Sequence, residues 1–480
     1  MIVERKPRIG LLLIGSPRFK PLGEGTAHGT YEARKLREEK EIIGEFQEIG
    51  EIVTPGIVYE REDVTKAIDL FFTRKVDCVA AAYLSWAEDF AWIRFLRDMP
   101  PVPLFFTSII RDRVEITDTN DEDEFVEFLS AGSLVGVQEA SGDLQRFHRP
   151  MTHTFIGTMG QVKKELGVFA QAALCRSQLR SSTLGLLASY NEAMWSTYVD
   201  PYHVFMKAGP ELRFLSVAQL TEKIGSVPKD AVEEAVRGIE ERFRISANVD
   251  REKLAASVRA SIALEELSGD YGIDLTVLND IDPVLLGSVG LRPGFCPTRG
   301  DSRLTVVPVN LKIRASSRAG LAVYILKLLS GRRANFIEPF YIIHQRNRFA
   351  AGHAGPNDYT QCPGNVVVAR DERFAKTEYR YAGAPFAWYV FPQGEKTMLH
   401  MSEKDGVLKM VCTVVEAAPT KHYLASYSHS EFRHQTLSPQ ELFQRLVSIG
   451  VTQHYAIVDG DWTKELEELA RLMGFDFYKI

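Results

Sequence analysis

Residues 8–15, RIGLLLIG, form a short apolar run bounded by Gly15 and Pro17, which predicts a buried β-strand. Residues 30–47, TYEARKLREEKEIIGEFQ, follow with the mixed charge and apolar spacing of a surface helix. Strand-like and helix-like stretches then alternate in the same way through residues 51–58, 61–75, 76–84, 87–99 and 101–108. This β-α-β-α order predicts a parallel sheet with helices on both faces.

A second α/β region follows the first. Residues 133–147, SLVGVQEASGDLQRF, are expected to join a strand to a helix, and residues 182–190, STLGLLASY, predict another buried strand. Residues 228–267 are charged and helical in pattern, whereas the chain becomes β-rich from about residue 304. We therefore predict an α/β protein made of two consecutive Rossmann-like parallel-sheet domains and a C-terminal β-rich domain, with boundaries at 1–168, 169–331 and 332–480.

The composition is that of an ordinary globular protein. The chain has 480 residues, of which 45% are hydrophobic and 25% charged, which excludes a disordered chain, a collagen-like repeat and a disulfide-stapled miniprotein. Its 57 basic and 63 acidic residues give a net charge of −6. A mild acidic balance does not produce the field that non-specific nucleic-acid binding needs, so no nucleic-acid partner is expected.

Short motifs exclude several other classes of protein. The apolar run at 9–15 is far shorter than the about 20 residues that span a bilayer, and no signal-peptide cleavage pattern follows it. The five cysteines are scattered, which argues against disulfides and favours a cytoplasmic setting. The glycines that follow the first strand do not have dinucleotide-binding spacing, and no phosphate-binding P-loop motif is present.

Three residues on or beside apolar strands are candidates for a site. Glu338 lies in NFIEPFYII, His353 lies among small residues in AAGHAGP, and His454 begins an apolar strand in GVTQHYAIVDGDW. A carboxylate inside an apolar run needs a partner, and one Glu with two His would make an incomplete nitrogen/oxygen metal site. The alternative is that all three are polar residues satisfied by backbone hydrogen bonds.

Other candidates are weaker. Cys296 has no recognisable partner for a nucleophile. Irregular spacing among polar neighbours predicts a solvated loop for His422, His429 and His434. The basic cluster of Lys312, Arg314 and Arg318 has two interpretations: it binds an anion, or it is a solvated face.

Five segments carry a family resemblance that covers most of the chain. They are GVQEASGDLQRF (136–147), STLGLLASYNEAMW (182–195), AGLAVYILKLLSGRRANFIEPFYII (319–343), NRFAAGHAGP (347–356) and GVTQHYAIVDGDWTKELEELARLMGFDFYKI (450–480). In their order and spacing these segments resemble those of the L-arabinose/L-fucose isomerase superfamily. By this resemblance the chain would be a divergent member.

The resemblance implies a β-barrel-like unit in the last domain and a homo-oligomer, a trimer or a hexamer, with active sites near subunit contacts. It implies Mn²⁺, or another divalent metal, and aldose–ketose interconversion through an enediol. Glu338 matches the second acidic ligand and a catalytic carboxylate, while His353 and His454 match the histidine positions of the metal site. Gln138, in the family's Gly-x-Gln segment, and His353 would contact the sugar.

One position departs from the family pattern. Arg314 stands where the family has its first metal-site glutamate, and arginine neither ligates a cation nor shuttles protons near neutral pH. Asp301 is the only acidic residue between Cys296 and Arg318 and is the local candidate to replace that glutamate. If it does not, the metal is weakened or lost. Arg314 would then bind an anionic sugar derivative in a lyase or hydrolase, or the protein would bind sugars without turnover.

Overall fold

The computed structural model describes most of the chain. The described residues are 5–187, 201–278, 285, 294–295, 305–308, 316–354, 359, 364–372, 376, 382–424 and 427–480. The chain divides into two compact units. We call Glu4–Ser177 with Arg471–Met473 the N-terminal unit, and Gln178–Ala470 with Gly474–Ile480 the C-terminal unit.

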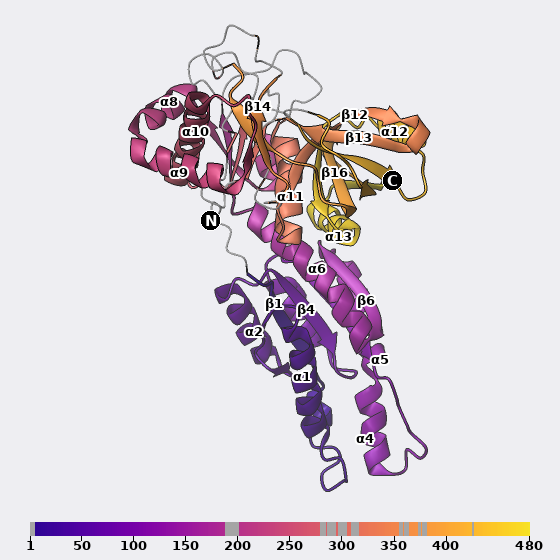
Figure 1. Ribbon diagram of the computed structural model, residues 1–480. Helices are drawn as coiled ribbons and strands as arrows, with labels where there is room; N and C mark the ends of the chain where they lie inside the picture. Colours follow the sequence, from indigo (N-terminus) through magenta and orange to yellow (C-terminus); the bar gives the residue numbers. More distant parts are fainter. Residues whose placement is uncertain are drawn as a thin grey trace. The chain divides into compact units, whose positions relative to one another are not determined.

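The N-terminal unit is built on a parallel sheet (Figure 1). Its strands are β1 (Arg8–Ile14), β2 (Glu51–Val53), β3 (Ile57–Val58), β4 (Cys78–Tyr83), β5 (Leu104–Ile110) and β6 (Thr152–Thr158). They lie in the order β2-β1-β4-β5-β6, and β3 also pairs with β1. Its helices are α1 (Tyr31–Gln47), α2 (Arg61–Thr73), α3 (Asp89–Asp98), α4 (Glu122–Ala131), α5 (Ser133–Phe147) and α6 (Met159–Leu179). Leu11 and Leu12 point to opposite faces of the sheet, and both are fully buried because both faces are covered.

A second parallel sheet begins the C-terminal unit. Its strands are β7 (Thr183–Leu187), β8 (Glu211–Leu215), β10 (Leu275–Leu278) and β11 (Thr305–Pro308), in the order β11-β10-β7-β8. Between them lie α7 (Pro201–His203), α8 (Val217–Ser226), α9 (Lys229–Arg242) and α10 (Arg251–Asp270). Val277 and Leu278 face opposite sides and are both fully buried, so this sheet is also covered on both faces.

Helix α11 (Ser316–Ser330) connects the second sheet to the strands that follow. Its residues from 320 to 326 are all buried, so it is apolar on every side over nearly two turns. One side packs on β10, where a Cβ at Gly320 would lie 2.6 Å from Val277 Cγ2. The other side packs on the strands β16 and β19. The helix is therefore enclosed between two sheets.

A closed antiparallel β-barrel of six strands forms the rest of the C-terminal unit (Figure 1). The strands are β12 (Asn335–Ile343), β13 (Arg348–His353), β16 (Gly394–Lys404), β17 (Val407–Ala418), β18 (Ser428–His434) and β19 (Tyr455–Asp459). They pair in the order β16-β19-β12-β13-β18-β17, and β17 returns to β16 to close the ring. Closure removes the sheet edges that would otherwise be open to pairing.

Smaller elements complete the C-terminal unit. The strands β9 (Arg244–Ile245), β14 (Val367–Arg370) and β15 (Pro385–Trp388) form a separate sheet, and β20 (Asp476–Lys479) pairs with β17. The helix α12 (Pro439–Ser448) lies between β18 and β19 in the sequence, and α13 (Thr463–Met473) follows β19. Within the described residues, we find no helix with the length and apolar character that a membrane span requires.

The predicted fold class is confirmed: parallel α/β structure precedes a β-barrel. Two local predictions were wrong. Residues 51–58 form two short strands rather than one, because Gly56 adopts a φ of +92° between them. Residues 133–147 are helical throughout and contain no strand.

Gly352 is a point of close approach between two barrel strands. It lies in β13 opposite Glu338 of β12 on one side and His429 of β18 on the other. A Cβ at this position would lie 2.7 Å from His429 Cα and still closer to the carbonyl oxygen of Ser428. Both are backbone atoms of a paired strand, so neither is free to move aside.

We expect Gly352→Ala to destabilise the protein by about 1–3 kcal/mol, because the methyl group would overpack two hydrogen-bonded strands. The matched control is Gly238→Ala in the middle of α9, where a Cβ meets only the end of the Arg242 side chain at 3.9 Å. That change should stabilise the protein by about 0.5–1 kcal/mol through helix propensity. Urea unfolding of both variants checks the pair, and equal midpoints would show that the barrel tolerates a side chain at 352.

Candidate functional site

Three residues predicted from the sequence lie on neighbouring strands of the barrel. Glu338 is in β12, His353 ends β13, and His454 immediately precedes β19. Strand β12 lies between the other two strands. Its antiparallel pairing of Ile337 with Tyr455 brings Glu338 beside His454. Three segments far apart in the sequence therefore meet through strand register alone.

The two histidines are buried beside a more exposed carboxylate. Glu338 Oε2 lies 3.8 Å from His454 Nε2, and the Glu338 side chain is 30% exposed. His353 and His454 are 3% and 5% exposed, and their ring centroids lie 6.4 Å apart. The ring of Phe336 contacts both imidazoles, at 4.7 Å from His353 and 4.9 Å from His454. The structure thus brings all three residues together, and the Phe336 ring packs against both imidazoles.

The donor chemistry of these residues suits a divalent cation. One carboxylate and two imidazoles are ligands that Mn²⁺ and Zn²⁺ accept. Two imidazoles that share one tetrahedral ion have ring centroids about 5 Å apart, so the His353 and His454 rings would have to approach each other to hold one together. In the part of the chain that the structure describes, no group of three or more His, Cys, Asp or Glu side chains is already arranged to hold a metal ion.

The other predicted site residues do not join this group. Gln138 is exposed on α5 of the N-terminal unit. Asp301 and Arg314 lie outside the described residues. In the sequence, Arg314 lies between β11 and α11.

The prediction of a solvated loop for the three later histidines was wrong in part. His429 lies in β18 and is completely buried, and His434 ends the same strand. His422 stacks on Trp388 with ring centroids 4.0 Å apart. Sequence reasoning missed this cluster because β18, SHSEFRH, has no apolar alternation that would mark it as a barrel strand.

Burial keeps two of these histidines neutral. The pKa of His422 is lowered to about 4, by burial first and also by the nearby His429 and Arg244. Burial also lowers the pKa of His429, although the carbonyl oxygens of Tyr427 and Lys421 act in the opposite direction. Both rings therefore carry no charge at neutral pH.

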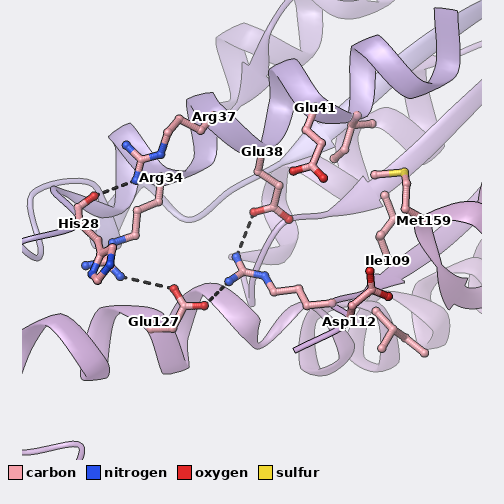
Figure 2. Close-up of a pocket in the computed structure, with 12 residues that line it drawn as sticks. His28, Arg34, Arg37, Glu38, Glu41, Ile109, Asp112, Glu127 and Met159 are labelled. Carbon is pink, nitrogen blue, oxygen red and sulfur yellow. Dashed lines mark hydrogen bonds and ion pairs between the residues drawn. The ribbon is translucent and has the colours of Figure 1, made fainter. Parts of the chain in front are cut away.

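The N-terminal unit contains a separate cavity of about 360 Å³ (Figure 2). It is lined by charged residues of α1, α4 and the segment after β5, and by the apolar side chains of Ile42, Ile109, Ile110 and Met159. Arg111 forms ion pairs with Glu127 and Glu38. Its Nη2 atom lies 3.2 Å from Glu38 Oε2. Arg34 pairs with Asp123 and Glu127.

A buried lysine is paired with one of the residues that line this cavity. Lys35 is fully buried and donates to Glu38 at 2.7 Å and to the carbonyl oxygen of Ser130 at 2.9 Å. The pKa of Lys35 is lowered to about 8, because burial outweighs the opposite effect of Glu38. The paired charges tie α1 to α4 and to the end of β5, and none of the predicted site residues lines the cavity.

Comparison with known proteins adds no family assignment. No protein-family model matches the chain, and no curated protein matches it in sequence.

His422 makes the protein sensitive to acid. Its folded pKa is about 4, below the unfolded value of about 6.5. The unfolded chain therefore binds more protons between these pH values, and stability falls as the pH drops from 6.5 towards 4. In His422→Phe this loss should be smaller by on the order of 1 kcal/mol at pH 5, after allowance for the partial exposure of His422. Urea unfolding at pH 7.5 and pH 5 measures the difference, and an identical pH dependence in both proteins would contradict it.

Proposed function

We propose that this protein is a divalent-metal-dependent aldose–ketose isomerase that acts on an open-chain sugar. The observation that carries the proposal is the meeting of Glu338, His353 and His454 on adjacent barrel strands. These are the three positions that the resemblance to L-arabinose/L-fucose isomerases assigns to the metal site. The second parallel sheet, which α11 holds against the barrel, adds the type of scaffold whose strand ends bind small molecules.

The side chains are suited to proton transfer between neighbouring carbons. Glu338, His353 and His454 would hold the metal, which when bound would polarise the sugar carbonyl. Glu338 is partly exposed, so its carboxylate is within reach of a ligand, and its Oε2 lies 3.8 Å from His454 Nε2, with which it would share the metal. It would remove a proton from one carbon and return it to the next through an enediol. Buried Phe336 would keep water from the inner side of the two imidazoles.

A second candidate function follows from Arg314. A guanidinium in the connection before α11 would offer two parallel hydrogen bonds to a carboxylate or phosphate. The reaction would then be a lyase or hydrolase reaction on an anionic sugar derivative. For the isomerase, we infer Mn²⁺ as the metal and a homo-oligomer as the active form.

Glu338→Gln tests the proposal directly. The amide keeps the size of the side chain but removes its charge and its basicity, so bound metal should fall and ketose formation should drop about 10³-fold. Glu416→Gln is the matched control, because Glu416 forms an exposed pair with Arg433 on another barrel strand. Elemental analysis of protein purified without chelators, and a screen of pentoses, hexoses and sugar acids, give the two readouts. Equal metal content and turnover in wild type and Glu338→Gln would contradict the proposal.

Arg314→Glu separates the two candidate functions. If Arg314 faces the metal, like charges a few ångströms apart repel each other, and replacing arginine with a carboxylate should strengthen metal binding at least tenfold. The same change should weaken any sugar acid or sugar phosphate ligand. Isothermal titration with Mn²⁺ and with a sugar acid measures both effects. Turnover of anionic sugars alone in the wild type would favour the second candidate, and unchanged affinities would place Arg314 outside the site.

A further inference from the structure

Strand β6 forms one edge of the parallel sheet in the N-terminal unit (Figure 1). The backbone N–H of Leu104 donates to the carbonyl oxygen of Met151, and Leu104 is in register with Thr152. Alternate residues of a strand direct their backbone groups to the same neighbour, so the odd-numbered residues of β6 bond to β5. The even-numbered residues, from Thr152 to Thr158, direct their backbone groups away from the sheet.

Two contacts within the chain close the ends of this edge. Arg471, which belongs to the N-terminal unit, donates from Nη1 to the carbonyl oxygen of Thr152 at 2.7 Å. At the other end, the backbone N–H of Thr158 donates to Gln161 Oε1 at 3.0 Å. The part of the edge that remains for pairing is therefore short.

The middle of the edge is open. Thr154 and Ile156 are exposed, and no described residue bonds to their outward N–H and C=O groups. We call Thr154 and Ile156 the open edge. Strand β6 contains no Asp, Glu, Lys, Arg or Pro, although charged residues and proline are what ordinarily protect a sheet edge from pairing.

Two other edges of the parallel sheets are protected. Strand β2, at the opposite edge of the same sheet, has only three residues. Strand β8, at an edge of the second sheet, carries Glu211 and Arg213, which are both exposed. Arg213 is the central residue of β8, so antiparallel pairing with a second β8 would set two arginines opposite each other. Neither shortness nor charge protects the open edge of β6.

Apolar side chains lie beside the open edge. Ile156 is 49% exposed, and its register partner Ser108 shares its face of the sheet. Ile110, two residues further along β5, shares that face and is also 49% exposed. Ser108 Oγ lies 2.9 Å from Ser133 Oγ, which brings the first turn of α5 with the exposed Leu134 to the same region. Exposed apolar surface next to free backbone groups is typical of an interaction site.

We propose that the open edge binds a second copy of this chain, with the two β6 strands antiparallel about a two-fold axis at Phe155. Thr154 then lies opposite Ile156 of the partner subunit, and both residues direct their backbone groups outward. Opposite residues of this kind exchange two hydrogen bonds in an antiparallel pair, so the two copies satisfy all the free groups of the open edge. In a parallel pair the bonding residues are offset by one position, so a two-fold axis could not satisfy the same residues in both copies.

A second copy fits the open edge better than an unrelated strand. The contacts of Arg471 and Gln161 limit the open edge to two bonding residues, and an identical strand has a free segment of the same length. Strands without acidic or basic residues do not repel each other, and Phe155 would face its own copy as an aromatic cross-strand pair. A two-fold contact joins copies in pairs, so it predicts a dimer or another even-numbered assembly. This inference does not depend on the proposed function.

Two variants test the contact. Thr154→Pro removes an N–H that points away from β5, so the sheet keeps its own hydrogen bonds while the facing carbonyl oxygen loses its donor. Ile156→Lys places a charge on the open edge and opposes pairing. Each should weaken self-association about tenfold or more, as measured by sedimentation velocity of the full chain at micromolar concentrations. Phe72→Lys is the matched control, because Phe72 is 70% exposed on α2 and the same charge there should leave assembly unchanged.

Hydrogen exchange of the wild type adds a test that does not depend on how the variants fold. The amides of Thr154 and Ile156 should exchange more slowly at high than at low protein concentration. The amide of Thr158 should not respond, because it already donates to Gln161. Circular dichroism verifies that each variant is folded.

The possible outcomes divide clearly. A dimer that the two β6 variants dissociate, or a hexamer that they split into trimers, would support the inference. A monomeric or trimeric wild type, or an even-numbered assembly that neither variant weakens, would overturn it. Slow exchange of the Thr154 and Ile156 amides at every dilution of a monomer would assign the open edge to a different partner and would overturn it equally.

Discussion

The enclosure of α11 is the constraint on which the C-terminal unit depends. A helix that is apolar on every side cannot lie on a protein surface. It must be covered on both sides, and here the second parallel sheet covers one side while β16 and β19 of the barrel cover the other. Gly320 lets the helix approach β10 closely enough to exclude gaps. The same helix begins after the connection that contains Arg314 and is followed by β12, the strand of Glu338.

Closure of the barrel positions the residues of the candidate site. Closure fixes the register of all six strands, because a slip of one residue would turn every side chain to the opposite face. Glu338 then has His454 on one side and Gly352 on the other without any help from loops. Residues on strands of a closed sheet hold their positions better than residues on loops, which suits the proposed reaction, in which a carboxylate must lie beside two carbons.

The parts of this structure that the sequence could predict are those where one physical rule dominates. Apolar runs such as residues 8–15 become buried parallel strands, and the acid and histidines beside such runs meet in the structure. Helix α5 was mistaken for a strand and a helix because Val135, Gly136 and Val137 resemble the end of a strand. Strand β18 was missed for a different reason. Its residues Ser428, His429, Ser430 and Glu431 are polar and yet buried.

Buried polar strands are stabilised by partners that are distant in sequence. Ser430 donates to Thr420 at 3.1 Å, and Arg346 and Arg348 pair with Glu431. No local pattern reveals such contacts, because they exist only once the barrel has closed.

One glycine connects the fold and the site. Gly352 is required by strand packing, since any side chain there would strike the backbone of β18. Gly352 also pairs with Glu338 on its other side, so the close approach that excludes a side chain at 352 fixes the strand that carries the carboxylate. The packing of β13 against β18 therefore helps to determine where Glu338 lies relative to His454.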